Sequence, residues 1–152
     1  MIILDTEVLS ETIKSRPDPV VMRFLDSLDP TTTYLTAVTA AELLRGITLM
    51  PGGNRQRSLE NAAFRILTDT FKGRILPFDL AAADRYSKMA AAASQQSKPI
   101  RFAEGMIGAI ALQKSATVAT RSLEALRALD VPIINPWAEH ASNKPSEAGL
   151  AP

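Results

Sequence analysis

Acidic side chains carry the strongest chemistry in this sequence because the other common catalytic types are scarce. The 152 residues contain no cysteine, which excludes disulfides, thiolate metal sites and a cysteine nucleophile. The single histidine, His140, lies near the end of the chain, which argues against a histidine-based metal cluster or a serine–histidine–aspartate triad. Carboxylate oxygens remain, and they suit hard divalent ions such as Mg²⁺ or Mn²⁺. The sequence therefore favours a site built from acids and a metal.

Three acids stand where such a site is expected. Asp5 directly follows a short apolar run, and the carboxyl end of a buried strand faces the usual ligand crevice; the alternative role is a helix N-cap. Glu42 lies in an apolar stretch of a predicted helix. An unpaired acid buried there would be costly and would need a functional reason; the alternative is that Glu42 simply faces solvent. Glu104 lies near the first turn of an apolar helix, where the helix dipole alone favours an acid. No single acid defines a site.

Short apolar runs alternate with helix-like stretches, and these elements must position the acids. The expected strands are residues 2–4, 34–37, 74–78, 116–119 and 133–134. One helix is expected to begin at residues 5–6. The other expected helices cover residues 17–28, 38–49, 55–71, 80–96 and 102–114. This alternation predicts an α/β fold, a three-layer sandwich with a mainly parallel central sheet. Ligands bind such sheets beyond the carboxyl ends of the strands.

Composition indicates one globular domain in the cytoplasm. The chain is 46% apolar and 22% charged with a net charge of +1, so a nucleic-acid contact must use a local patch. No apolar run approaches the roughly 20 residues of a spanning helix, and the N-terminus lacks the pattern of a signal peptide. After Trp137 the composition shifts to small and polar residues. We therefore expect a domain over residues 1–138 and a flexible tail over 139–152.

An ordered series of short motifs runs through the chain. The motifs are MIILDT at 1–6, TAVTAAEL at 36–43, GRILPFD at 73–79, PI at 99–100 before the Glu104 helix, ATR at 119–121 and VPIINPW at 131–137. The series resembles the PIN domain, in particular the VapC/FitB-like toxins of type II toxin–antitoxin pairs. The resemblance covers about residues 1–138.

The resemblance implies an Mg²⁺- or Mn²⁺-dependent endoribonuclease that acts as the toxin of a bacterial toxin–antitoxin pair. It implies Asp5, Glu42 and Glu104 as catalytic, metal-binding acids. In this chemistry the metal activates a water and offsets charge that develops on the phosphodiester. The implied partners are an RNA substrate, a second copy of the chain and a small antitoxin. An antitoxin arm that covers the acids and carries arginine would suit a carboxylate cluster.

The sequence departs from the family pattern at four positions. Glu104 stands where the family normally has Asp, which moves the carboxylate one methylene further from the backbone. Ser122 and Ala125 stand where the family shows Asp or Asn and then another acid, and neither supplies a carboxylate. Glu7 stands where the family usually has Asn or Ser. It either adds a carboxylate beside Asp5 or is a surface acid in the first turn of a helix.

Basic residues flank the acids and are candidates for holding RNA phosphates. Arg45 is one helical turn beyond the second acid, Lys98 and Arg101 precede the third, and Arg121 follows a predicted strand. The alternative for each of them is ordinary surface charge.

Two functions from different classes stay open. The first is an active toxin nuclease. The second is a catalytically weak or inactive PIN homologue that binds antitoxin or RNA without cutting, and the residues at 104 and 122 favour it. A third reading, a phosphatase or nucleotide-binding domain, lacks a glycine-rich phosphate loop after the first strand.

Overall fold

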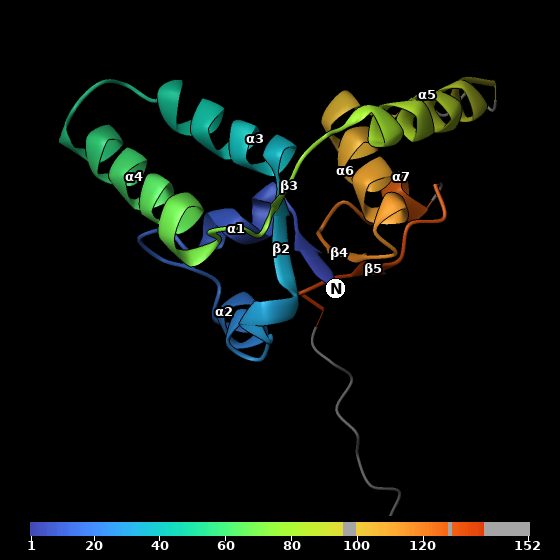
Figure 1. Cartoon of the computed structure of the whole chain (residues 1–152). Helices are drawn as coiled ribbons and strands as arrows, with labels where there is room; N and C mark the ends of the chain where they lie inside the picture. The colour runs from blue at the N-terminus through green and yellow to red at the C-terminus, as the bar shows by residue number, and fades with distance from the viewer. Residues whose placement is uncertain (96–99, 128, 139–152) are drawn as a thin grey trace, which may run out of the picture.

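The computed structural model describes residues 1–95, 100–127 and 129–138, and its centre is a five-stranded sheet (Figure 1). The strands are β1 (Ile2–Leu4), β2 (Thr33–Thr36), β3 (Ile75–Leu76), β4 (Thr117–Ala119) and β5 (Ile133–Ile134). Their spatial order is β3-β2-β1-β4-β5, and every neighbouring pair is parallel. The predicted mainly parallel α/β sandwich is therefore confirmed.

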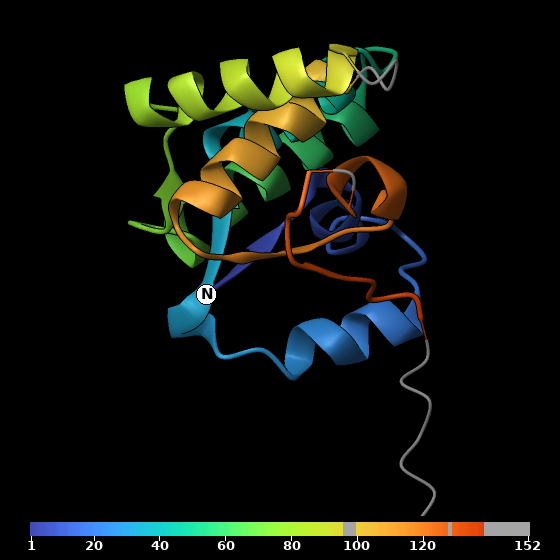
Figure 2. The ribbon, with the colours of Figure 1, turned by 90° about the vertical axis from the view of Figure 1, so that its right-hand side faces the viewer.

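Helices cover both faces of the sheet. They are α1 (Thr6–Glu11), α2 (Pro19–Asp26), α3 (Ala37–Thr48), α4 (Asn54–Arg65), α5 (Leu80–Gln95), α6 (Phe102–Gln113) and α7 (Leu123–Arg127). Figure 1 shows α1, α2 and α4 to the left of the strands, and α5, α6 and α7 to the right. Figure 2, turned by 90°, shows α5 and α6 running together above the sheet and α2 below it. None of the described helices has the length and apolar character needed to cross a bilayer.

Strands β1, β2, β3 and β4 each supply side chains to two separate cores. Successive residues of a strand point to opposite faces of the sheet, so Ile3 and Val118 enter the core beneath α5 and α6. Leu4, Leu35 and Ala119 enter the core beneath α1, α2 and α4. Burial on both faces is why these short strands are apolar at consecutive positions instead of alternating.

The predicted boundaries need four corrections. The helix expected over residues 55–71 ends at Arg65, and a π-helical turn, Ile66–Thr70, follows it. The helix expected from residue 17 begins at Pro19, because the Asp18 side chain accepts a bond from Val20 N at 2.8 Å and caps it. The sequence also missed α7 and the 3₁₀ turn Pro30–Thr32. The predicted tail, together with Lys98 and His140, lies outside the described residues.

The ends of β1 and β4 meet at the point where the chain reverses its direction across the sheet. From β1 the chain moves outward to β2 and β3, then crosses to β4 on the other side of β1. The amide of Asp5 donates to Ala119 O at 3.0 Å, so the two strand ends lie side by side. Parallel sheets bind ligands at such a switch point. Residues directly after β1 and β4 are therefore the first place to look for a site.

Helices α5 and α6 approach closely because one of them carries a glycine at the contact. A Cβ added to Gly105 would lie 2.7 Å from Tyr86 Cε2 and 3.3 Å from Ile100 Cγ2. Gly105 is fully inside α6, so its role is space and not a turn. The first turn of α6, which holds Glu104, is thereby seated firmly against α5.

Gly105→Ala is expected to lower the free energy of unfolding by about 1–3 kcal/mol, because the added methyl overpacks this contact. Gly46→Ala is the matched control, since a Cβ added there on α3 meets nothing within 4 Å. The control should gain about 0.5–1 kcal/mol from helix propensity. Urea denaturation of both variants beside the native chain measures these changes. Equal shifts in the two variants would contradict the contact.

Candidate functional site

Asp5 is fixed at the carboxyl end of β1 by hydrogen bonds to both carboxylate oxygens. Oδ1 accepts from Thr6 N at 2.7 Å, so Asp5 caps α1. Oδ2 accepts from Thr120 Oγ1 at 2.7 Å, and Thr120 directly follows β4. The side chain thus serves as an N-cap and also occupies the crevice at the switch point. The N-cap role weighed from the sequence is confirmed, and the ligand-binding role stays a prediction.

The pKa of Asp5 is raised, and burial is the main cause. Asp5 is only 8% exposed, and desolvation disfavours its charged form. The hydrogen bonds from Thr120 and Thr6 lower this pKa, whereas the charges of Glu42 and Glu7 raise it. The charged form of Asp5 is therefore disfavoured mainly by its burial, with a smaller contribution from its acidic neighbours. A bound divalent cation would favour the charged form.

Glu42 is joined to Asp5 through one intervening residue. Thr6 Oγ1 donates to Glu42 Oε2 at 2.7 Å, while the Thr6 amide donates to Asp5. Glu42 reaches this point because α3 starts directly after β2, where the Thr36 side chain accepts from Thr39 N at 3.0 Å and caps the helix. Glu42 is half-buried and faces the site, so the solvent-facing alternative does not describe it.

Glu104 is joined to Asp5 from the opposite side of the sheet. Ser122 Oγ donates to Glu104 Oε1 at 2.7 Å, and Ser122 N donates to Thr120 Oγ1 at 2.9 Å. Thr120 in turn donates to Asp5. Hydrogen bonds therefore connect the acids of β1, α3 and α6 in one continuous chain. The three acids lie at the same edge of the sheet, as their sequence positions predict.

Sequence reasoning missed the three hydroxyl residues that connect the acids by hydrogen bonds. Thr6 and Thr120 follow β1 and β4 directly, and that shared position was the available signal. Ser122 was noted only for the carboxylate it lacks. In the structure its hydroxyl is a donor that orients Glu104, and its amide helps to orient Thr120.

The carboxylate oxygens suit a hard divalent ion, although the three acids do not converge on a single metal position. Among the residues that the structure describes, no three Asp, Glu, His or Cys side chains form a group that could hold a metal ion. Asp5 and Glu42, both bonded to Thr6, are the pair that fits best. The assignment of Asp5, Glu42, Glu104 and Glu7 as ligands stays a prediction.

The remaining candidates lie around the acids without direct hydrogen bonds to Asp5 or Glu42. Glu7 is exposed in the first turn of α1 and acts on Asp5 through its charge.

The candidates for phosphate contacts are three arginines. Arg101 Nη1 lies 3.9 Å from Glu104 Oε1, and the Arg101 side chain is 85% exposed. Arg45 is exposed near the end of α3. Arg121 places its Cζ 4.2 Å from the ring centroid of Trp137. Their phosphate contacts stay a prediction.

A groove opens beside Glu42 on the side of α1, α3 and α4. It has a volume of about 600 Å³, and Thr6 and Glu42 belong to its wall. Three basic residues, Lys14, Arg16 and Arg55, also line it, together with apolar residues of α3. The groove therefore combines an acidic end with basic and apolar walls, which suits a peptide of mixed character.

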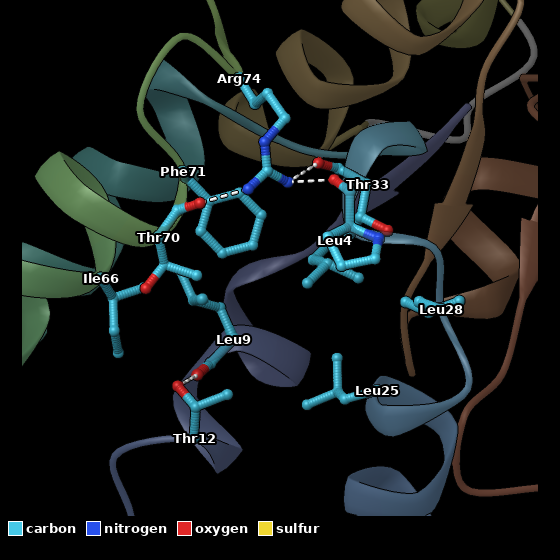
Figure 3. A pocket seen from close by; sticks show the side chains of 11 residues that line it. Leu4, Leu9, Thr12, Leu25, Leu28, Thr33, Ile66, Thr70, Phe71 and Arg74 are labelled. Carbon is cyan, nitrogen blue, oxygen red and sulfur yellow. Dashed lines mark hydrogen bonds between the residues drawn. The ribbon is translucent and has the colours of Figure 1, made fainter.

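A second cavity of about 390 Å³ lies between α1, α2 and the π-helical turn (Figure 3). Its leucines, among them Leu9 and Leu25, make it mainly apolar. Arg74 lies across one side, where its guanidinium donates to the carbonyls of Pro30, Thr33 and Thr70. These bonds occupy the guanidinium within the fold. Arg74 is therefore a structural clamp and not a free cation for a ligand.

Asp5→Asn is expected to remove the pH dependence of stability that Asp5 causes. The pKa of Asp5 is raised by burial, so the folded state keeps this proton to a higher pH than the unfolded state does. Native stability therefore falls as the pH rises from the ordinary value of 3.8 through the raised value, and the variant escapes this loss. Chemical denaturation of both proteins across this pH window measures the difference. A difference that does not change with pH would contradict the argument.

Comparisons with known proteins agree with this architecture. The PIN domain family matches residues 2–130. The chain is 41% identical over 137 residues to toxin FitB of Neisseria gonorrhoeae, covering 90% of this chain and 99% of that protein. It is 40% identical to VapC ribonuclease Y4jK of Sinorhizobium fredii, covering 90% and 98%. The crystal structure of FitAcB from Neisseria gonorrhoeae matches with a TM-score of 0.85, covering 90% of this chain and 99% of that chain. The chain therefore belongs to the PIN-domain family.

Proposed function

We propose that this chain is a divalent-metal-dependent endoribonuclease and the toxin of a bacterial toxin–antitoxin pair. The observation that carries the proposal is the hydrogen-bonded chain that joins Asp5, Glu42 and Glu104 at the switch point of the sheet. The similarity to a protein named toxin FitB and to one named VapC ribonuclease supports it. A PIN domain is a scaffold, so the acids and not the fold must carry the activity.

Mg²⁺ or Mn²⁺ would be held by Asp5 and Glu42, with Glu104 as a third oxygen donor. When bound, the ion supplies activation of water and neutralisation of charge that develops on the phosphodiester. The chain's own residues hold the donors in place. Thr6 fixes Asp5 with its amide and Glu42 with its hydroxyl, while Ser122 fixes Glu104. Such supporting bonds commonly govern how well a site binds its metal.

Basic residues supply the contact with the RNA backbone in this proposal. Arg101 stands beside Glu104, and Arg45 lies one turn beyond Glu42 on α3. Both are exposed and close in sequence to an acid, which places positive charge at the border of a negative site. Phosphates would be drawn to this border while the acids and their metal face the scissile bond.

The partners in this proposal are a small antitoxin and a second copy of the chain, in the cytoplasm. The solved relatives include FitAB and VapBC toxin–antitoxin complexes. The groove beside Glu42 is the place where an antitoxin arm would lie, and a guanidinium from that arm would pair with the carboxylates. Leu80 and Phe102 are 86% and 65% exposed, which gives apolar surface for association between copies.

A second candidate function is a PIN homologue that binds without cutting. Ser122 supplies a hydroxyl where a fourth carboxylate would strengthen a metal site, and the described acids do not form a group of three ligands. Weak metal binding would leave a protein that still presents the groove and the basic border.

RNA cleavage separates the two candidates. The native chain, incubated with a mixed single-stranded RNA pool and Mn²⁺, is expected to release fragments, and a chelator should stop the release. Asp5→Ala should reduce the rate by more than about 100-fold because it removes the central acid. Glu124→Ala is the matched control, since Glu124 is an exposed acid on α7 outside the hydrogen-bonded chain. No cleavage by the native chain supports the binding-only protein, and cleavage by Asp5→Ala at the native rate contradicts the site.

Metal affinity tests how the acids share the ion. Mn²⁺ is expected to bind more tightly than Mg²⁺, because affinity rises along the divalent series and Mn²⁺ tolerates less regular geometry. The double change Glu104→Asp with Ser122→Asp adds a carboxylate and should tighten binding by about tenfold. If Glu7 already supplies that oxygen, the double change adds little and Glu7→Gln abolishes binding. Calorimetric titration of the native chain and both variants decides. Tight Mg²⁺ binding that none of these changes affects would place the metal elsewhere.

A further inference from the structure

Arg121 and Trp137 form a stacked pair at the same edge of the sheet as the acids. The Arg121 guanidinium lies over the indole, with Cζ 4.2 Å from the ring centroid. Arg121 comes from the loop after β4, and Trp137 from the segment after β5. Because β4 and β5 pair in parallel, both residues follow carboxyl ends of strands. The pair is therefore next to the switch point where Asp5 lies.

The backbone of Arg121 is held on both sides by the hydrogen-bonded chain of the acids. Thr120 precedes it and donates to Asp5, whereas Ser122 follows it and donates to Glu104. Consecutive Cα atoms are about 3.8 Å apart, so Arg121 starts within one residue of a contact to each of two candidate acids. The Arg121 side chain therefore starts at the border of the candidate site.

Trp137 provides a fixed support beneath the guanidinium. The indole packs against the core under α1, α2 and α4, and the preceding Pro136 is buried. The Trp137 amide donates to Asn135 Oδ1 at 3.0 Å, which closes the turn after β5. A cation over an indole face is held by the ring quadrupole as well as by contact. The guanidinium is thus positioned before any ligand arrives.

The outer face of Arg121 is open. Arg121 is exposed, and none of the salt bridges within residues 1–95, 100–127 and 129–138 involves it. Stacking on Trp137 uses one face of the guanidinium and leaves the other face in water. The planar guanidinium has two faces, and a flat ligand can cover the second one.

We propose that the stacked pair of Arg121 and Trp137 is a binding platform for one nucleobase of a single-stranded RNA, next to the phosphodiester that the acids face. This inference rests on the proposed function, because it assigns a base-binding subsite to the same substrate. Proteins that recognise single-stranded RNA commonly stack unpaired bases on aromatic rings or on guanidinium planes. Stacking tolerates all four bases, since each has a π face. The platform therefore determines the position of the RNA on the protein and contributes little to base specificity.

The role of Arg121 differs from a phosphate contact in a measurable way. A phosphate contact needs only charge, so Arg121→Lys would preserve it. Stacking needs the planar group, so the lysine variant would lose it while the net charge stays the same. The salt dependence of binding, which counts phosphate contacts, should then be unchanged.

The experiment uses short single-stranded RNAs with one abasic nucleotide moved along the sequence. Binding is measured by fluorescence anisotropy with the native full chain in excess chelator, which stops metal-dependent cleavage without altering the hydrogen bond from Thr120 to Asp5. Under these conditions one abasic position should weaken binding by about tenfold. With Arg121→Lys added, intact RNA should bind about tenfold more weakly, and the same abasic position should cost nothing further. The slope of affinity against salt should match in the two proteins.

Three controls keep the interpretation sharp. Trp137→Phe keeps an aromatic support and should retain the abasic effect, and circular dichroism checks that each variant is folded. Phe102→Leu tests the other exposed aromatic near Glu104. If the abasic effect disappears in that variant and persists in Arg121→Lys, the platform is wrong. It is also wrong if Arg121→Lys weakens binding of an antitoxin and leaves RNA binding unchanged. Absence of RNA binding and cleavage by the native chain would overturn the proposed nuclease itself.

Discussion

The placement of one buried carboxylate determines how this site is built. Asp5 lies where β1 ends, at 8% exposure, and its two oxygens accept bonds from α1 and from the loop after β4. Burying a charge without compensation is costly, so these bonds limit the conformations that the loop after β4 can take. That loop carries Thr120, Arg121 and Ser122 in succession. The position of every group on the β4 side of the site therefore depends on how Asp5 is satisfied.

The charged form of the same carboxylate is disfavoured in the site. Burial and the charges of Glu42 and Glu7 raise the pKa of Asp5 above its ordinary value in spite of both hydrogen bonds. A core packed for stability alone would use a neutral side chain there. An acid at this point costs stability, a trade that functional sites commonly show. Ser122 adds no further negative charge to the site, and its hydroxyl donates a hydrogen bond to Glu104.

The sequence could predict the sheet, because consecutive apolar residues mark strands that are buried on both faces. The acids were singled out as a set by the resemblance to a family, and their role stays a prediction. The bonds between them could not be predicted. Thr120 and Asp5 are 115 residues apart in the sequence, and their contact exists only because β4 returns to lie beside β1. The π-helical turn after Arg65 was missed for a different reason, since the helical pattern of the sequence continues through it.

The three residues after β4 join two functions that are usually considered separately. Thr120 and Ser122 orient acids on opposite sides of the switch point, and Arg121 between them is stacked on Trp137. Adjacent residues share a planar peptide unit, so a rotation of the backbone at Arg121 also displaces its neighbours. A shift of the loop that re-aims Arg121 would therefore lengthen the bond to Asp5 or the bond to Glu104. In the proposed nuclease, the placement of the substrate and that of the carboxylates would be coupled through the backbone of this one segment.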